Sequence, residues 1–164
     1  MKLTRVLPVM VLVALLSFSC STDSIPEEAI DSMALPTPPV AKTIEIEILE
    51  LINAHRISEG LTPLNNHNTI KAVAYTHTDY MVESNNVGHD NFFQRKNSLI
   101  QNASATRVSE NVAYAYNSAQ SVVNAWINSD GHRDNIEGDF TDFDISAEQN
   151  DEGKWYFTNI FIKR

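Results

Sequence analysis

The chain has 164 residues, of which 43% are hydrophobic and 20% are charged, which is the composition of an ordinary globular protein. Its formal net charge of −9 argues against a nucleic-acid partner, because phosphates are bound by clusters of Lys and Arg. Its one cysteine, Cys20, excludes a disulfide framework, and a domain that follows Cys20 has neither a thiol nucleophile nor a Cys-zinc site.

Residues 1–20 have the layout of a secretory signal. Lys2 and Arg5 form a short basic start, and an apolar run from Val6 to Phe18 is too short to cross a bilayer comfortably. The pattern resembles a bacterial lipoprotein signal, in which Cys20 is lipidated and becomes the new N-terminus. Ser17 stands where such signals usually carry Leu. A plain secretory signal with an incidental cysteine is the alternative.

Residues 21–42 are predicted to be a linker, because four prolines among acidic and hydroxyl side chains favour a stiff, extended spacer. Without the signal, the chain carries 10 basic and 21 acidic side chains. Such an acidic domain is repelled by anionic lipid, so we expect contact with the membrane through a lipid anchor only. Residues 43–164 are long enough for one domain with its own core.

Four helices are predicted in this domain. The first spans residues 43–60, with Thr43 as its cap, Glu45 and Glu47 in its first turn and Gly60 at its end. The second runs over residues 69–85 after Asn68 as cap, a short helix is predicted within residues 91–100, and another within residues 118–128.

The C-terminal part of the chain favours strands. Residues 108–115 form a predicted strand, and residues 143–149 and 155–163 alternate on either side of turn residues, which indicates an antiparallel hairpin. Both faces of the last strand are apolar, so this strand is expected to lie between two layers of helices. The fold class is therefore α+β, with a small antiparallel sheet.

Several short motifs, in this order and spacing, resemble the CAP superfamily of cysteine-rich secretory proteins, in its bacterial, cysteine-poor branch. They are Asn53-Ala-His-Arg56 with Gly60-Leu-Thr-Pro-Leu64, Ala74-Tyr-Thr-His77, Gly88-His89, Ser109-Glu-Asn-Val-Ala113, Val122-Val-Asn-Ala-Trp126 with Ser129-Asp-Gly-His-Arg-Asp-Asn-Ile136, and Tyr156-Phe-Thr-Asn-Ile-Phe161. The resemblance covers the whole domain. It implies a three-layer α-β-α sandwich with a central small antiparallel sheet and a surface cleft.

The resemblance also implies the members of that cleft. In animal and plant members two His and two Glu line it, and His89, Glu110 and His132 match three of these positions. Ser129 stands where the second Glu would be, as is common in bacterial relatives. This departure weakens any chemistry that needs two carboxylates.

The chemistry open to these residues is limited. His89 and His132 could bind Zn²⁺, with Glu110 as a third ligand or as an acceptor that orients one imidazole. The alternative is a metal-free cluster held by hydrogen bonds. If the domain is enzymatic, Glu110 acting as general base and His132 would carry a metal-assisted hydrolysis, but no acid for the leaving group is evident.

Three hypotheses follow from the sequence. The first is an exported, cell-envelope domain that binds a small apolar ligand or an envelope protein and is not an enzyme. The second is a metal-assisted hydrolase that uses the same cleft, and the third is a structural surface domain. The chain is expected to be anchored through Cys20, with simple secretion as the alternative.

Overall fold

The computed structural model describes residues 35–164, and the predicted signal with Cys20 and the first part of the predicted linker lie outside these residues. Helices and strands follow one another along the chain as α1 Thr43–Ser58, β1 Asn65–Asn66, α2 Asn68–Ser84, α3 Phe92–Ala103, β2 Arg107–Tyr114, α4 Ala119–Ile127, α5 Asp130–Glu137, β3 Asp142–Gln149 and β4 Trp155–Lys163.

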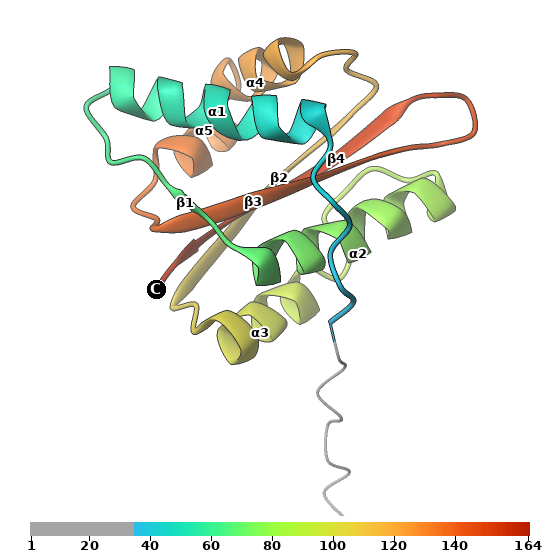
Figure 1. Cartoon of the computed structure of the whole chain (residues 1–164), viewed down its shortest axis with the longest axis horizontal. Helices are drawn as coiled ribbons and strands as arrows, with labels where there is room; N and C mark the ends of the chain where they lie inside the picture. The colour runs from blue at the N-terminus through green and yellow to red at the C-terminus, as the bar shows by residue number, and fades with distance from the viewer. Residues whose placement is uncertain (1–34) are drawn as a thin grey trace, which may run out of the picture. The chain divides into compact units, whose positions relative to one another are not determined.

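These elements form three layers, as the sequence predicted. Helices α1, α4 and α5 cover one face of the sheet and helices α2 and α3 cover the other (Figure 1). Each face has its own buried core. The first includes Ile48, Trp126, Phe143 and Phe161, and the second includes Ile70, Val73, Leu99 and Ile160.

The sheet has four strands in the order β1-β3-β4-β2. Strands β3 and β4 form the predicted antiparallel hairpin, β2 pairs antiparallel with β4, and the two-residue β1 pairs parallel with the start of β3. Strand β4 alternates between the two cores, with Phe157 and Phe161 in one and Ile160 and Ile162 in the other. The prediction that the last strand is sandwiched is confirmed, because apolar residues on both faces require cover on both sides.

The helix starts differ by one residue from the prediction. Lys42, not Thr43, is the N-cap of α1, and His67, not Asn68, is the N-cap of α2, where its imidazole accepts a hydrogen bond from the Thr69 N–H. Gly60 follows α1 with φ of 75°, a conformation that favours glycine. The left-handed residue Asn85 ends α2 as predicted.

The stretch from Trp126 to Ile136 contains two helices, whereas a single helix followed by a turn was predicted. Helix α4 ends at Ile127, and a separate helix α5 starts after its N-cap Ser129. His132 therefore belongs to the first turn of α5. Short breaks of this kind leave the apolar periodicity intact, so the sequence pattern does not reveal them.

The outer edge of β3 is covered by side chains from α1 and α2. Glu45 accepts the Ala147 N–H at 2.7 Å, and the Lys71 ammonium donates to the Ile145 carbonyl at 2.7 Å. Glu45 and Lys71 also form an ion pair at 2.6 Å, and both are buried. Glu45 thus binds the edge of the sheet in addition to its place in the first turn of α1.

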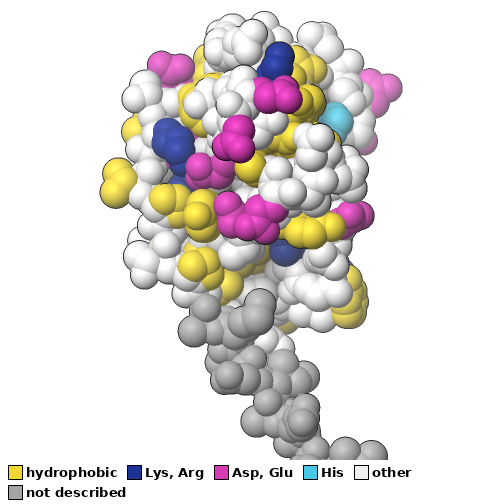
Figure 2. Space-filling view, turned by 90° about the vertical axis from the view of Figure 1, so that its right-hand side faces the viewer, with side chains coloured by type: hydrophobic (Ala, Val, Ile, Leu, Met, Phe, Trp, Pro, Cys, Tyr) yellow, Lys and Arg dark blue, Asp and Glu magenta, His cyan; other side chains and the backbone are white. Residues whose placement is uncertain are grey.

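The surface of the domain is acidic in keeping with its composition. On the face shown in Figure 2, acidic side chains lie between hydrophobic ones, with few basic groups. Among residues 35–164, every helix is too short or too polar to span a bilayer.

Candidate functional site

Glu110 is the centre of a buried charge network on the α2 and α3 side of the sheet. It pairs with Ile160 across the sheet, so its side chain lies on the same face as that core residue. The Arg95 guanidinium donates to both carboxylate oxygens, at 2.7 and 2.6 Å. His89 contacts the same carboxylate at 2.9 Å through Nδ1. Glu110 is therefore held by two partners and is 6% exposed.

The protonation of Glu110 reflects these partners. Burial by itself would raise its pKa, but hydrogen bonds from His89 and Arg95, together with the charge of Arg95, outweigh burial and lower the pKa. The carboxylate is consequently ionised at neutral pH and neutralised by Arg95. An ion so compensated is a poor general base, because protonating it would break the pair with Arg95.

His77 supports this network from helix α2. Its Nε2 lies 2.9 Å from the Gly88 carbonyl and 3.9 Å from Glu110. Burial, and then the charge of Arg95, lowers the pKa of His77, so a neutral ring that donates to Gly88 fits its surroundings. His77 is a buried residue, and its bond to Gly88 fixes the loop that carries His89.

The next residue of β2 faces the other layer of the sandwich. Asn111 is fully buried, donates to the His132 carbonyl at 3.0 Å and accepts from Asn135 at 2.8 Å. Asn135 also reaches the Glu110 carbonyl at 3.3 Å. Trp126 donates to the Val112 carbonyl at 3.1 Å. These bonds fasten α4 and α5 to the outer edge of β2.

The His132 imidazole lies on this side of the strand. Its Nδ1 is 2.9 Å from the Ser129 hydroxyl, which gives the residue at the lost carboxylate position a direct role in orienting the ring. Burial, and then the charge of His89, lowers the pKa of His132. The neutral imidazole is the form that can bind a metal.

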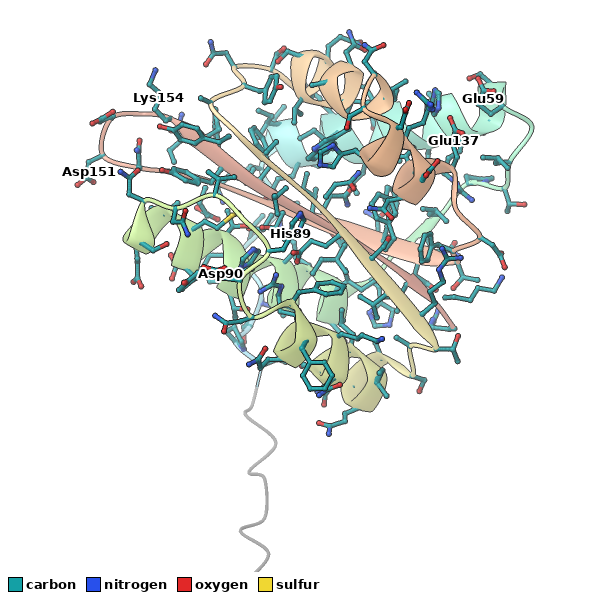
Figure 3. All side chains as sticks on the ribbon, turned by 180° about the vertical axis from the view of Figure 1, so that it is seen from behind. Glu59, His89, Asp90, Glu137, Asp151 and Lys154 are labelled. Carbon is teal, nitrogen blue, oxygen red and sulfur yellow. The ribbon has the colours of Figure 1, made fainter. Side chains whose placement is uncertain are left out.

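The two imidazoles thus approach the edge of β2 from opposite layers. His89 lies in the loop after α2, beside β2 in Figure 3, and its side chain is 52% exposed. Within residues 35–164, no hydrogen bond engages the Nε2 atom of either His89 or His132. We call these two residues, together with Glu110 and Ser129, the β2-edge cleft, after the surface cleft that the family resemblance implies.

The structure brings the predicted cleft residues together as two pairs, His89 with Glu110 and His132 with Ser129. It also includes Arg95, Asn111 and Asn135, which were not predicted as members of the cleft. The sequence did not indicate that Arg95 is buried at this site, because an arginine in a polar helix is usually solvated. In the described part of the chain, no three His, Cys, Asp or Glu side chains converge as a metal-binding group. Of the ligands that a catalytic zinc site needs, the described residues here offer two imidazoles, His89 and His132, and no third side chain that converges with them.

Comparison with known proteins places this architecture in a family. The model of the cysteine-rich secretory protein family, CAP, matches residues 49–161, and this chain belongs to that family. The chain is 30% identical over 129 residues to the uncharacterized membrane protein YlbC of Bacillus subtilis (strain 168), covering 76% of this chain and 36% of that protein. It is 32% identical over 105 residues to the uncharacterized protein YkwD of the same organism, covering 60% and 40%. The chain thus spans well under half the length of these relatives.

Solved structures share the fold. An outer surface protein from Borrelia burgdorferi matches with a TM-score of 0.65 at 23% identity, over 71% of this chain and 90% of that one. An extracellular protein containing an SCP domain from Bacillus anthracis str. Ames matches with a TM-score of 0.65 at 23% identity, over 73% of this chain and 40% of that one. These likenesses establish the α-β-α sandwich.

Proposed function

We propose that this chain is an exported, membrane-tethered domain that binds a ligand at the β2-edge cleft and does not catalyse a reaction. One observation carries the proposal. The carboxylate of the cleft, Glu110, is buried and is fully engaged by Arg95 and His89. A hydrolase working through this cleft would need Glu110 to accept and return a proton.

The groups that the cleft offers a ligand are the two outer imidazole nitrogens and an aromatic surface. A divalent metal such as Zn²⁺ would be held by His89 and His132, with water completing its shell and with modest affinity. Tyr114, further along β2, is 37% exposed and packs on Tyr156 at 4.6 Å between ring centroids. This ring supports a small apolar ligand or an envelope protein as the partner.

Zinc calorimetry tests the cleft. A soluble chain that begins at Ser21 is compared with its His89→Ala and His132→Ala variants, with unfolding curves to establish that each is folded. We expect weak zinc binding in the parent and its loss in both variants, because one imidazole alone does not retain the ion. No heat in the parent, or equal heat in all three proteins, would contradict the metal site.

The tether is tested separately. Cys20 lies outside the described residues, and its lipidation rests on the sequence pattern. YlbC is named a membrane protein and the Borrelia burgdorferi neighbour an outer surface protein, and both names support a location at a cell envelope. Cys20→Ser should release the protein from the membrane fraction into the soluble one. Continued sedimentation of that variant with membranes would count against a lipid anchor.

A further inference from the structure

A cavity lies at the opposite edge of the sheet from the residues of the β2-edge cleft. It has a volume of about 850 Å³, is open to solvent on one side, and is lined by α1, by residues 37–41 and by the connection from β1 into α2. Figure 1 shows these three segments around the outer edge of β3. Because β1 and β2 are the two edge strands, this cavity is separate from the cleft of the proposed function.

The walls of this cavity are mixed, and one part of them is apolar. That part includes Pro38, Pro39, Val40, Ile46, Leu49 and Ile57, while Thr37, Asn53, Asn66 and Asn68 add polar groups. Val40, Ile46 and Ile57 are 91%, 46% and 61% exposed, so the cavity gathers large hydrophobic side chains that the fold leaves in solvent. A volume of this size that combines apolar side chains with polar groups is large enough for a small molecule.

The floor of the cavity is charged. Glu45 from α1, Lys71 from α2 and Asp144 from β3 all reach it and are buried. The Lys71 ammonium already forms an ion pair with Glu45 at 2.6 Å and donates a hydrogen bond to the Ile145 carbonyl at 2.7 Å. The floor therefore contains two carboxyl groups and one ammonium group.

Asp144 is the carboxyl group that lacks a cation. It is 7% exposed, and its contacts are two neutral backbone donors, the N–H of Ile145 at 2.9 Å and that of His67 at 3.2 Å. No ion pair to Asp144 occurs among residues 35–164. Buried charges in proteins are normally paired with an opposite charge. The group that would complete the floor of this cavity is therefore a cation beside Asp144.

We propose that this cavity binds an organic ammonium ion with an apolar chain, whose cationic head pairs with Asp144 and whose chain lies along α1 against Ile46, Leu49 and Ile57. Glu50, which also lines the cavity, adds negative charge at its wall. The charge balance disfavours a carboxylate or phosphate head, because Glu45, Glu50 and Asp144 outnumber Lys71. Length is not restrictive, since the volume exceeds that of an octyl amine several-fold.

The site should depend on pH. Burial raises the pKa of Asp144 to about 6, against the effect of its backbone hydrogen bonds and of Lys71, and the charge of Glu45 raises it further. The charged groups facing it are thus Glu45 and Glu50 from α1 and Lys71 from α2, with His67 beside it at the start of α2. A bound cation favours the ionised carboxyl, so affinity rises with pH through this range.

Calorimetry on the full chain tests the proposal, with octylammonium as the probe and n-octanol and octanoate as neutral and anionic matches. We expect octylammonium to bind at about pH 7.5 and to bind about tenfold more weakly at about pH 5, where roughly one Asp144 in ten is ionised. Octanol should bind at least tenfold more weakly than octylammonium at about pH 7.5, and its affinity should not change with pH. Equal affinity for octanol and octylammonium at about pH 7.5, or stronger binding of octanoate, would overturn the proposal.

Two variants locate the site. Asp144→Asn should weaken octylammonium binding about tenfold and abolish its pH dependence, whereas Asp151→Asn, in the exposed turn of the hairpin labelled in Figure 3, should leave both unchanged. If Asp144→Asn does not fold, Ile57→Ser serves instead, since Ile57 is exposed and its loss should weaken binding about fivefold through lost apolar contact. Unchanged binding in a folded Asp144→Asn or in Ile57→Ser would refute the assignment.

Discussion

Glu110 and Asn111 are neighbours in strand β2, and their side chains bind helices on opposite faces of the sheet. Glu110 is bound by Arg95 of α3 and by His89, while Asn111 is bound to Asn135 and to the His132 carbonyl of α5. The alternation of a strand places consecutive side chains on opposite faces. A Glu-Asn pair on an edge strand therefore joins two helical layers and sets the two imidazoles on either side of one strand.

Replacing Arg95 by Met should reverse the direction in which the pKa of Glu110 is shifted. Removing one partner of a buried ion pair costs about 3–5 kcal/mol of the free energy of unfolding, because the other charge stays buried. In the parent protein the pKa of Glu110 is lower in the folded state than in the unfolded state. Glu110 therefore stabilises the fold above its unfolded pKa, and this stabilisation is lost as the pH falls through its folded pKa. In Arg95→Met the pKa should rise above the ordinary value and stability should instead improve on acidification.

The measurements are urea unfolding at several pH values and a carboxyl NMR titration. Lys96→Met on the same helix is the matched control, and it should change stability by less than about 0.5 kcal/mol. An unchanged pKa of Glu110 in Arg95→Met would show that the guanidinium does not control it.

Substitutions of Ser129 should tune the metal affinity that we propose. Ser129→Glu places a carboxylate beside the Nδ1 of His132 and should tighten zinc binding about 10-fold or more, since carboxylate partners of imidazole ligands carry effects of that size. Ser129→Ala removes the oxygen that orients the ring and should weaken binding. Calorimetry of the two variants against the parent gives the order, and a tighter Ser129→Ala would contradict it.

Asp144 should make the protein less stable as pH rises. The pKa of this acid is raised by burial to about 6 in the folded state, so the folded protein holds a proton that the unfolded chain releases near its ordinary value. Stability should fall by about 2–3 kcal/mol between about pH 4 and pH 7 from this group alone. Comparison with Asp144→Asn isolates it, because the difference between the two unfolding curves should show this slope, and a constant difference would exclude it.

Asn135 should be required for the position of α5. Its amide donates to the Asn111 side chain and to the Glu110 carbonyl, at 2.8 and 3.3 Å. Asn135→Ala leaves the buried Asn111 oxygen without this donor and should cost about 1–3 kcal/mol. Faster amide hydrogen exchange in α5, with α2 unaffected, is the expected signature. Asp134→Ala, at the neighbouring position of the same helix, is the control.

The layers of the fold were predictable because periodicity records burial. The apolar spacing of α1 and α2 and the alternation of β4 specify which faces are covered, whatever their partners. The order of the family-like motifs likewise pointed to His89, Glu110 and His132. The break between α4 and α5 was missed, because Ser129 interrupts the helix without changing the apolar pattern.

Charged residues were harder to place, because their role depends on partners distant in the chain. Glu45 fits the first turn of a helix by its sequence, yet it is fully buried against Lys71 of the next helix and against the Ala147 N–H, which is 102 residues away in the chain. Arg95 reaches Glu110 only after α3 folds against β2. No local pattern encodes such pairs.

The side-chain bonds at the two margins of the sheet have a consequence for crowded surroundings. At β3, Glu45 and Lys71 occupy the Ala147 N–H and the Ile145 carbonyl, and at β2, Asn135 and Trp126 occupy the Glu110 and Val112 carbonyls. A strand of another molecule would have to displace these groups before it could extend the sheet. Copies concentrated on one surface by the tether that we propose are thereby protected against edge-to-edge aggregation.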